Sequence, residues 1–137
     1  TQIDKYTFTY HPAISDTLQV FEITEGFDPT TYEDLNVKEI KGSLKEILEK
    51  YLDHPVTLIP CAGGDKVASE REQWNDGSNT LCIAPGVVVV YDRNDVTNKE
   101  LRKAGLKVIE ICGAELSRGR GGPRCMSMPP VREDVEW

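Results

Sequence analysis

Residues 79–91 read N-T-L-C-I-A-P-G-V-V-V-V-Y and contain two β-prone runs on either side of a proline–glycine pair. The second run, Val87 to Tyr91, consists of β-branched and aromatic residues, which favour an extended and largely buried strand. Pro85-Gly86 fits the tight turn of a hairpin. This stretch therefore predicts two adjacent strands, 79–84 and 87–91, joined by a short turn.

The residues that follow predict a helix and a third strand. Thr97-Asn98-Lys99-Glu100 matches a capping box, in which a hydroxyl and a glutamate each satisfy a free backbone N–H at the start of a helix. Gly105 can adopt the left-handed conformation that ends a helix, and Lys107 to Ile111 again has strand character. The region 79–111 is therefore predicted to be one β-β-α-β unit.

The same order of elements is predicted nearer the N-terminus. Its parts are strands at Lys5 to Tyr10 and Thr17 to Thr24, a capping box at Ser43-Leu44-Lys45-Glu46, and a strand at Val56 to Pro60. Two copies of one unit predict an α/β repeat protein in which helices pack on sheets and further units complete the array. The predicted boundaries are module one at about 5–61, a connector at about 62–78 and module two at about 79–128. Within the connector, a short helix is predicted at Ser69 to Trp74.

The composition indicates one globular domain or part of a larger one, since the 137 residues are 39% hydrophobic and 28% charged. The longest apolar run is far shorter than the roughly 20 residues that cross a bilayer, so no membrane association is expected. The formal net charge of −7 argues against a nucleic-acid partner despite the R-G-R-G-G stretch at 118–122, because phosphate binding needs a cationic surface.

The cysteines argue against both a metal site and a disulfide framework. None of the four forms a C-x-x-C pair, and only His11 and His54 could add nitrogen ligands, so no metal is expected. In an acidic chain without a secretory leader pattern, unclustered thiols indicate a reducing, cytoplasmic location. Cys61, Cys82 and Cys112 lie in or beside apolar strand patterns and are expected to fill the core. Each histidine precedes a proline, which favours a structural or exposed role over a catalytic one.

Residues 116–129 read L-S-R-G-R-G-G-P-R-C-M-S-M-P and place Cys125 in a glycine-rich loop with three arginines. Guanidinium groups stabilise a thiolate, and glycines let the backbone approach a ligand closely, so Cys125 is the first candidate for a nucleophile. The alternative is that Cys125 begins an ordinary buried strand as a small hydrophobic residue. Both interpretations stay open on the pattern alone.

Three acidic residues near the connector are weaker candidates. Glu70, Glu72 and Asp76 could supply acid or base chemistry, but carboxylates on a short connecting helix usually form a solvated face. We therefore favour the solvated interpretation.

Three stretches of the chain resemble one family. They are E-R-E-Q-W-N-D-G-S-N at 70–79, E-L-S-R-G-R-G-G-P-R-C-M-S-M-P at 115–129 and T-L-I-P-C-A-G-G-D-K at 57–66, and the likeness extends over the whole chain. They resemble the C-terminal region of bacterial arginine deiminases. The resemblance implies the pentein fold, an α/β propeller in which five β-β-α-β modules form a ring around a central active site. This chain would then contribute two of the five modules.

The resemblance also implies roles for two residues. Cys125 matches the family nucleophile, which attacks the guanidinium carbon of L-arginine, releases ammonia and forms a thiouronium adduct that water converts to citrulline. Arg120 matches an arginine that lies near this cysteine and moves when substrate binds, although a solvated loop cation is the alternative. No cofactor is implied, and we expect the full-length protein to be a homo-oligomer.

Other parts of the family machinery do not match this sequence. The aspartates that bind the guanidinium group, the catalytic glutamate and the H-x-D motif precede the matched region, and His11 and His54 are each followed by proline. We therefore expect the chain alone to be inactive and to need a missing N-terminal part. Two alternatives remain. The chain could be a non-catalytic module that pairs with its missing half or with copies of itself, or it could belong to a pentein enzyme for another guanidino substrate.

Overall fold

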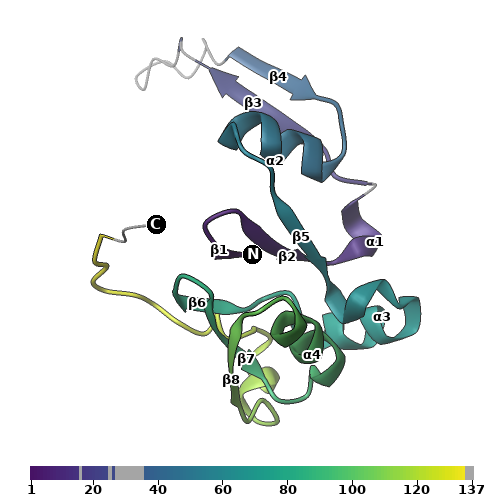
Figure 1. Cartoon of the computed structure of the whole chain (residues 1–137), viewed down its shortest axis with the longest axis vertical. Helices are drawn as coiled ribbons and strands as arrows, with labels where there is room; N and C mark the ends of the chain where they lie inside the picture. Colours follow the sequence, from purple (N-terminus) through teal and green to yellow (C-terminus); the bar gives the residue numbers. More distant parts are fainter. Residues whose placement is uncertain (16, 25, 27–35, 135–137) are drawn as a thin grey trace. The chain divides into compact units, whose positions relative to one another are not determined.

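The computed structural model describes residues 1–15, 17–24, 26 and 36–134 of the chain. The chain divides into two compact units, one made of Thr1–Pro12 with Pro55–Trp137 and the other of Ala13–His54. Helices and small sheets alternate along the chain, so the expected α/β class is confirmed (Figure 1). No described helix combines the length and the apolar character needed to cross a membrane.

The predicted β-β-α-β unit at 79–111 is confirmed. It consists of β6 (Leu81–Ala84), β7 (Val87–Tyr91), α4 (Asp95–Lys103) and β8 (Lys107–Ile111). Strand β7 lies in the middle of the sheet, antiparallel to β6 and parallel to β8. Helix α4 connects the two parallel strands and contacts β8 (Figure 1).

The two ends of α4 differ in how well the sequence predicted them. The prediction of a capping box at Thr97 is wrong, because the helix begins at Asp95 and its N-cap residue, Asn94, makes no side-chain capping bond. At the other end, Gly105 adopts φ +89°, and Leu106 donates its N–H to the carbonyl of Leu101 at 3.2 Å. These features are those of a glycine-terminated helix, as predicted.

A second sheet in the compact unit of Thr1–Pro12 with Pro55–Trp137 differs from the prediction. It has the order β1-β2-β5, in which β1 (Gln2–Asp4) is antiparallel and β5 (Thr57–Pro60) parallel to β2 (Thr7–Tyr10). The outer hairpin strand is therefore β1, not the predicted strand at Thr17 to Thr24. Ile3 and Ile59 from this sheet join a core with Val88 and Val90 of β7, Leu101 of α4 and Leu106 of the connection from α4 to β8.

The unit Ala13–His54 contains the strand that was expected in that sheet. Strand β3 (Val20–Thr24) pairs antiparallel with β4 (Asn36–Ile40), and α2 (Leu44–Leu52) follows. The capping box of α2 is confirmed, since Ser43 Oγ accepts the N–H of Glu46 at 3.3 Å and Glu46 Oε2 accepts the N–H of Ser43 at 2.8 Å. A short helix, α1 (Pro12–Ser15), lies at the boundary between the two units.

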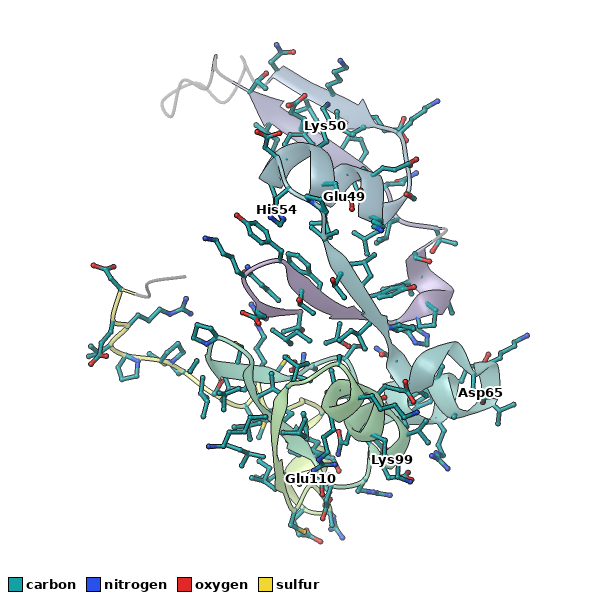
Figure 2. The ribbon with its side chains drawn as sticks, viewed as in Figure 1. Glu49, Lys50, His54, Asp65, Lys99 and Glu110 are labelled. Atoms are coloured by element: carbon teal, nitrogen blue, oxygen red, sulfur yellow. The ribbon has the colours of Figure 1, made fainter. Side chains whose placement is uncertain are left out.

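The connector carries a helix that begins earlier than predicted. Helix α3 (Lys66–Trp74) starts after Asp65, whose carboxylate accepts the N–H of Ala68 at 2.8 Å (Figure 2). A kinked 3-10 segment, η1 (Cys61–Gly64), in which Ala62 and Gly63 have positive φ, precedes it and contacts both α3 and α4. The connector is therefore packed against α4 through η1.

Candidate functional site

The glycine-rich loop begins with a second 3-10 turn, η2 (Leu116–Gly119), and then continues without regular structure. Gly121, Gly122 and Pro123 are buried, whereas Cys125 is exposed in a turn. The interpretation of Cys125 as the start of a buried strand is therefore wrong. The buried residues anchor the loop and leave the thiol accessible.

The side chain of Asn79 binds Cys125 twice. Asn79 Nδ2 donates to Cys125 Sγ at 2.8 Å, and Asn79 Oδ1 accepts the backbone N–H of Cys125 at 3.1 Å. Gly122 packs directly on Asn79, because a Cβ at residue 122 would lie 2.7 Å from the Asn79 carbonyl oxygen. Only glycine permits this approach, so the loop and Asn79 fit together as one unit.

Tyr91, at the end of β7, anchors the same loop from the sheet. Its phenol donates to the carbonyl of Gly121 at 2.9 Å. Gly113 lies against the ring, where a Cβ would come within 2.6 Å of Tyr91 Cγ. Burial, and then the negative charges of Asp76 and of ionised Cys125, raise the pKa of Tyr91. The phenol therefore stays protonated as a donor, and both acidic groups lie within electrostatic reach of it.

A polar hollow of about 440 Å³ lies in the same unit. Arg120 lines it in the left-handed conformation, with φ +61°. Asp76 also lines it, and burial raises the pKa of this carboxyl group. The remaining lining residues are His11, Glu70, Gln73, Trp74 and Ser117. The hollow thus brings acidic, cationic and aromatic groups together with Arg120, which belongs to the same loop as Cys125.

The three loop arginines have different surroundings. Arg118 Nε lies 3.1 Å from a carboxylate oxygen of Glu115, and both side chains are exposed. Arg120 faces the hollow, and Arg124 is exposed beside Cys125 in the sequence. The donor that reaches Sγ is the Asn79 amide, a residue that the sequence pattern did not indicate.

The three acidic candidates also differ in how deeply their side chains are buried. Glu72 is completely buried, so the expectation of a solvated face is wrong for this residue. Its carboxylate accepts the backbone N–H groups of Val96 at 3.0 Å and Thr97 at 2.8 Å, together with the Thr97 hydroxyl. Glu72 therefore caps α4 from another helix. Glu70 is exposed, as expected, and Asp76 is partly buried.

The histidines lie in different units. His11 is buried, its Nδ1 is 3.2 Å from the hydroxyl oxygen of Ser69, and its side chain lines the hollow. His54 is exposed and follows the end of α2 (Figure 2). A structural or exposed environment was expected for both, but the place of His11 in the hollow was not.

The remaining cysteines confirm the core prediction only in part. Cys61 is buried next to the Thr97 hydroxyl, and burial is the main cause of its raised pKa. Cys82 is partly buried, which also raises its pKa. Cys112 is exposed, so its assignment to the core is wrong. Within the described residues, no group of three or more His, Cys, Asp or Glu side chains could hold a metal ion.

The fold and the site define a segment of an α/β protein that presents a cysteine thiol on an anchored glycine-rich loop, another residue of which, Arg120, lines a hollow. The family model described as arginine deiminase matches residues 1–132. Over 136 residues, or 98% of this chain, it is 63% identical to the arginine deiminase of Treponema denticola and 57% identical to that of Streptococcus gordonii. The arginine deiminase of Clostridium perfringens is 56% identical over 135 residues.

This chain belongs to the arginine deiminase family. It spans about a third of the length of these curated relatives, since the alignments cover 32% of each of them.

Proposed function

We propose that this chain is the C-terminal part of an enzyme that hydrolyses L-arginine to L-citrulline and ammonia, and that Cys125 is its nucleophile. Family membership supports the reaction. The single observation that supports the residue is the exposed Cys125 thiol, which accepts a hydrogen bond from Asn79 on a loop with a buried anchor. A thiol held in this way is accessible to substrate and oriented before it binds.

In the proposed reaction, Cys125 Sγ forms a bond to the guanidinium carbon of L-arginine. A proton passes to the departing nitrogen, the C–N bond breaks and ammonia leaves, so a thiouronium adduct remains. Water then adds to the same carbon, the C–S bond breaks, and citrulline and the free thiolate are released. The net reaction consumes one water and needs no cofactor.

The carboxylates and the proton donor for this reaction belong, in our proposal, to the rest of the polypeptide. A guanidinium carbon is a poor electrophile until carboxylates bind the cation and an acid protonates the leaving nitrogen. Residues 5–61 and 79–128 would be two of five β-β-α-β modules in a pentein ring, with 62–78 as their connector. Arg120 would contact or gate the substrate, and the complete protein would be a cytoplasmic homo-oligomer.

Activity of the full-length protein with single cysteine substitutions tests this proposal. Cys125→Ala should lower kcat by at least about 10³-fold, because a methyl group cannot form the adduct. Cys112→Ala is the matched control, since it removes the other exposed thiol and should leave citrulline formation within about twofold of wild type. Normal turnover by Cys125→Ala would contradict the proposal.

A further inference from the structure

We propose that Asn79 is a positioning residue for the nucleophile, which orients Cys125 and stabilises its thiolate form. The inference rests on the proposed function in one respect, namely that the Cys125 thiolate is the reacting group. Asn79 is 46 residues from Cys125 in the sequence and precedes β6, yet its amide makes both hydrogen bonds to Cys125 described above.

The chemistry of the two bonds fixes the direction of the amide. The backbone N–H of Cys125 can only donate, so the Asn79 oxygen must face it. The amide nitrogen is then left facing Sγ at 2.8 Å as a donor. A donor at this position favours the form of the sulfur that only accepts, which is the thiolate. One side chain thus binds both the backbone and the sulfur of Cys125.

Asn79 is itself restrained, so the amide does not have to be ordered during the reaction. Its backbone N–H donates to the carbonyl of Asp76 at 2.9 Å, and Gly122 packs against its Cβ, Oδ1 and carbonyl oxygen. Tyr91 fixes the other side of the loop through Gly121. These contacts are all made by groups of this chain, so they orient the thiol independently of any contact from substrate.

The test compares Asn79→Asp and Asn79→Ala in the full-length protein. Asn79→Asp keeps an oxygen acceptor for the Cys125 N–H but replaces the donor to sulfur by a negative charge. Asn79→Ala removes both bonds. Asn75→Asp is the matched control, because it makes the same chemical change at an amide that donates to the Arg71 carbonyl instead.

Two readouts are needed: the rate of Cys125 alkylation by iodoacetamide as a function of pH, and kcat with KM for citrulline formation. For Asn79→Asp, the pH of half-maximal alkylation should rise by about one unit or more, with the same maximal rate at high pH. Asn79→Ala should shift it upward by less. Both should lower kcat about tenfold or more with a smaller change in KM, and Asn75→Asp should change neither readout.

An unchanged alkylation profile in both Asn79 variants would overturn the proposal, even if kcat fell, because a merely structural role would not move this profile. The alkylation measurement does not depend on turnover. A failure of the proposed function, seen as normal activity of Cys125→Ala, is therefore distinguishable from a failure of this inference.

Discussion

Two thiols of this chain are exposed, but within the part that the structure describes only Cys125 combines exposure with a hydrogen-bond donor from a restrained side chain. The sequence indicated Cys125 through its glycines and arginines, which are local signals. It could not indicate Asn79, because the contact between the two residues spans 46 positions and depends on the fold. Gly122 indicates a place where the backbone of the loop packs closely on another part of the chain. The sequence pattern does not show that this other part is Asn79.

We predict that Cys125 is the first of the four cysteines to be alkylated. Limited iodoacetamide labelling of the folded chain, followed by peptide mapping, should modify Cys125 before Cys112, with Cys82 and Cys61 slowest. The reason is that burial raises the pKa of Cys61 and Cys82, which lowers their thiolate fraction and access. Cys112 is the internal control for exposure. Faster labelling of Cys112 would contradict the account of the Cys125 environment.

Among the secondary-structure elements, helix α4 shows why local patterns mislead. Thr97 and Glu100 have the spacing of a capping box, but the N–H groups at the start of α4 are bound by Glu72 from α3. A carboxylate at a helix N-terminus satisfies free N–H groups and interacts favourably with the helix dipole. At α2 the local capping box at Ser43 and Glu46 forms as predicted.

The capping of α4 predicts a large effect of Glu72→Gln on stability. The substitution turns one acceptor oxygen into a donor that faces backbone N–H groups, so it should lower the free energy of unfolding by about 2–4 kcal/mol. Denaturant unfolding of the chain measures this. Glu70→Gln, on the same helix but exposed, is the control and should change stability by less than about 0.5 kcal/mol. Equal effects of the two substitutions would contradict the capping role.

The turn after α3 predicts a pH-dependent effect of Asp76→Asn. Burial raises the pKa of Asp76 in the folded chain. The ionised carboxyl group therefore lowers the free energy of unfolding at pH values above that pKa. At acidic pH this loss disappears, because the carboxyl group is protonated in both the folded and the unfolded chain. Asparagine tolerates the left-handed backbone of residue 76, so the variant should be more stable than wild type at pH 7 and similar at pH 3. Thermal unfolding checks this, with the exposed Asp134→Asn as control. A loss of stability confined to pH 7 would contradict it.

At the scale of the whole molecule, the order of strands and helix over 79–111 could be predicted, whereas the pairing of the N-terminal strands could not. Strand β7 is an unbroken apolar run, Pro85-Gly86 marks the turn before it, and Gly105 marks the end of α4, but the predicted start of α4 is wrong. In the other sheet, β1 is only three residues long with a single buried side chain, Ile3, so it has no detectable alternation. Strand β4 is mostly exposed, and no sequence signal separates it from a loop.

From the proposed function we predict that the chain alone produces no citrulline. In that proposal the proton donor and the guanidinium-binding carboxylates belong to the rest of the polypeptide, and a thiolate without them would lose several interactions, each worth about 10²-fold or more. A mixture with the remaining N-terminal part should recover activity, because repeat units depend mainly on their nearest neighbours. The assay compares each part alone with the mixture. Turnover by this chain alone would contradict the prediction.

The central claim is that Cys125 forms the bond to substrate, and rapid acid quench of the full-length protein with L-arginine tests it most directly. Intact-mass analysis and peptide mapping of the quenched protein should locate an adduct, equal to arginine less ammonia, on the peptide that contains Cys125. The adduct should be absent from Cys125→Ala and present in Cys112→Ala. Citrulline formation with no adduct on Cys125, or an adduct on another residue, would contradict the account.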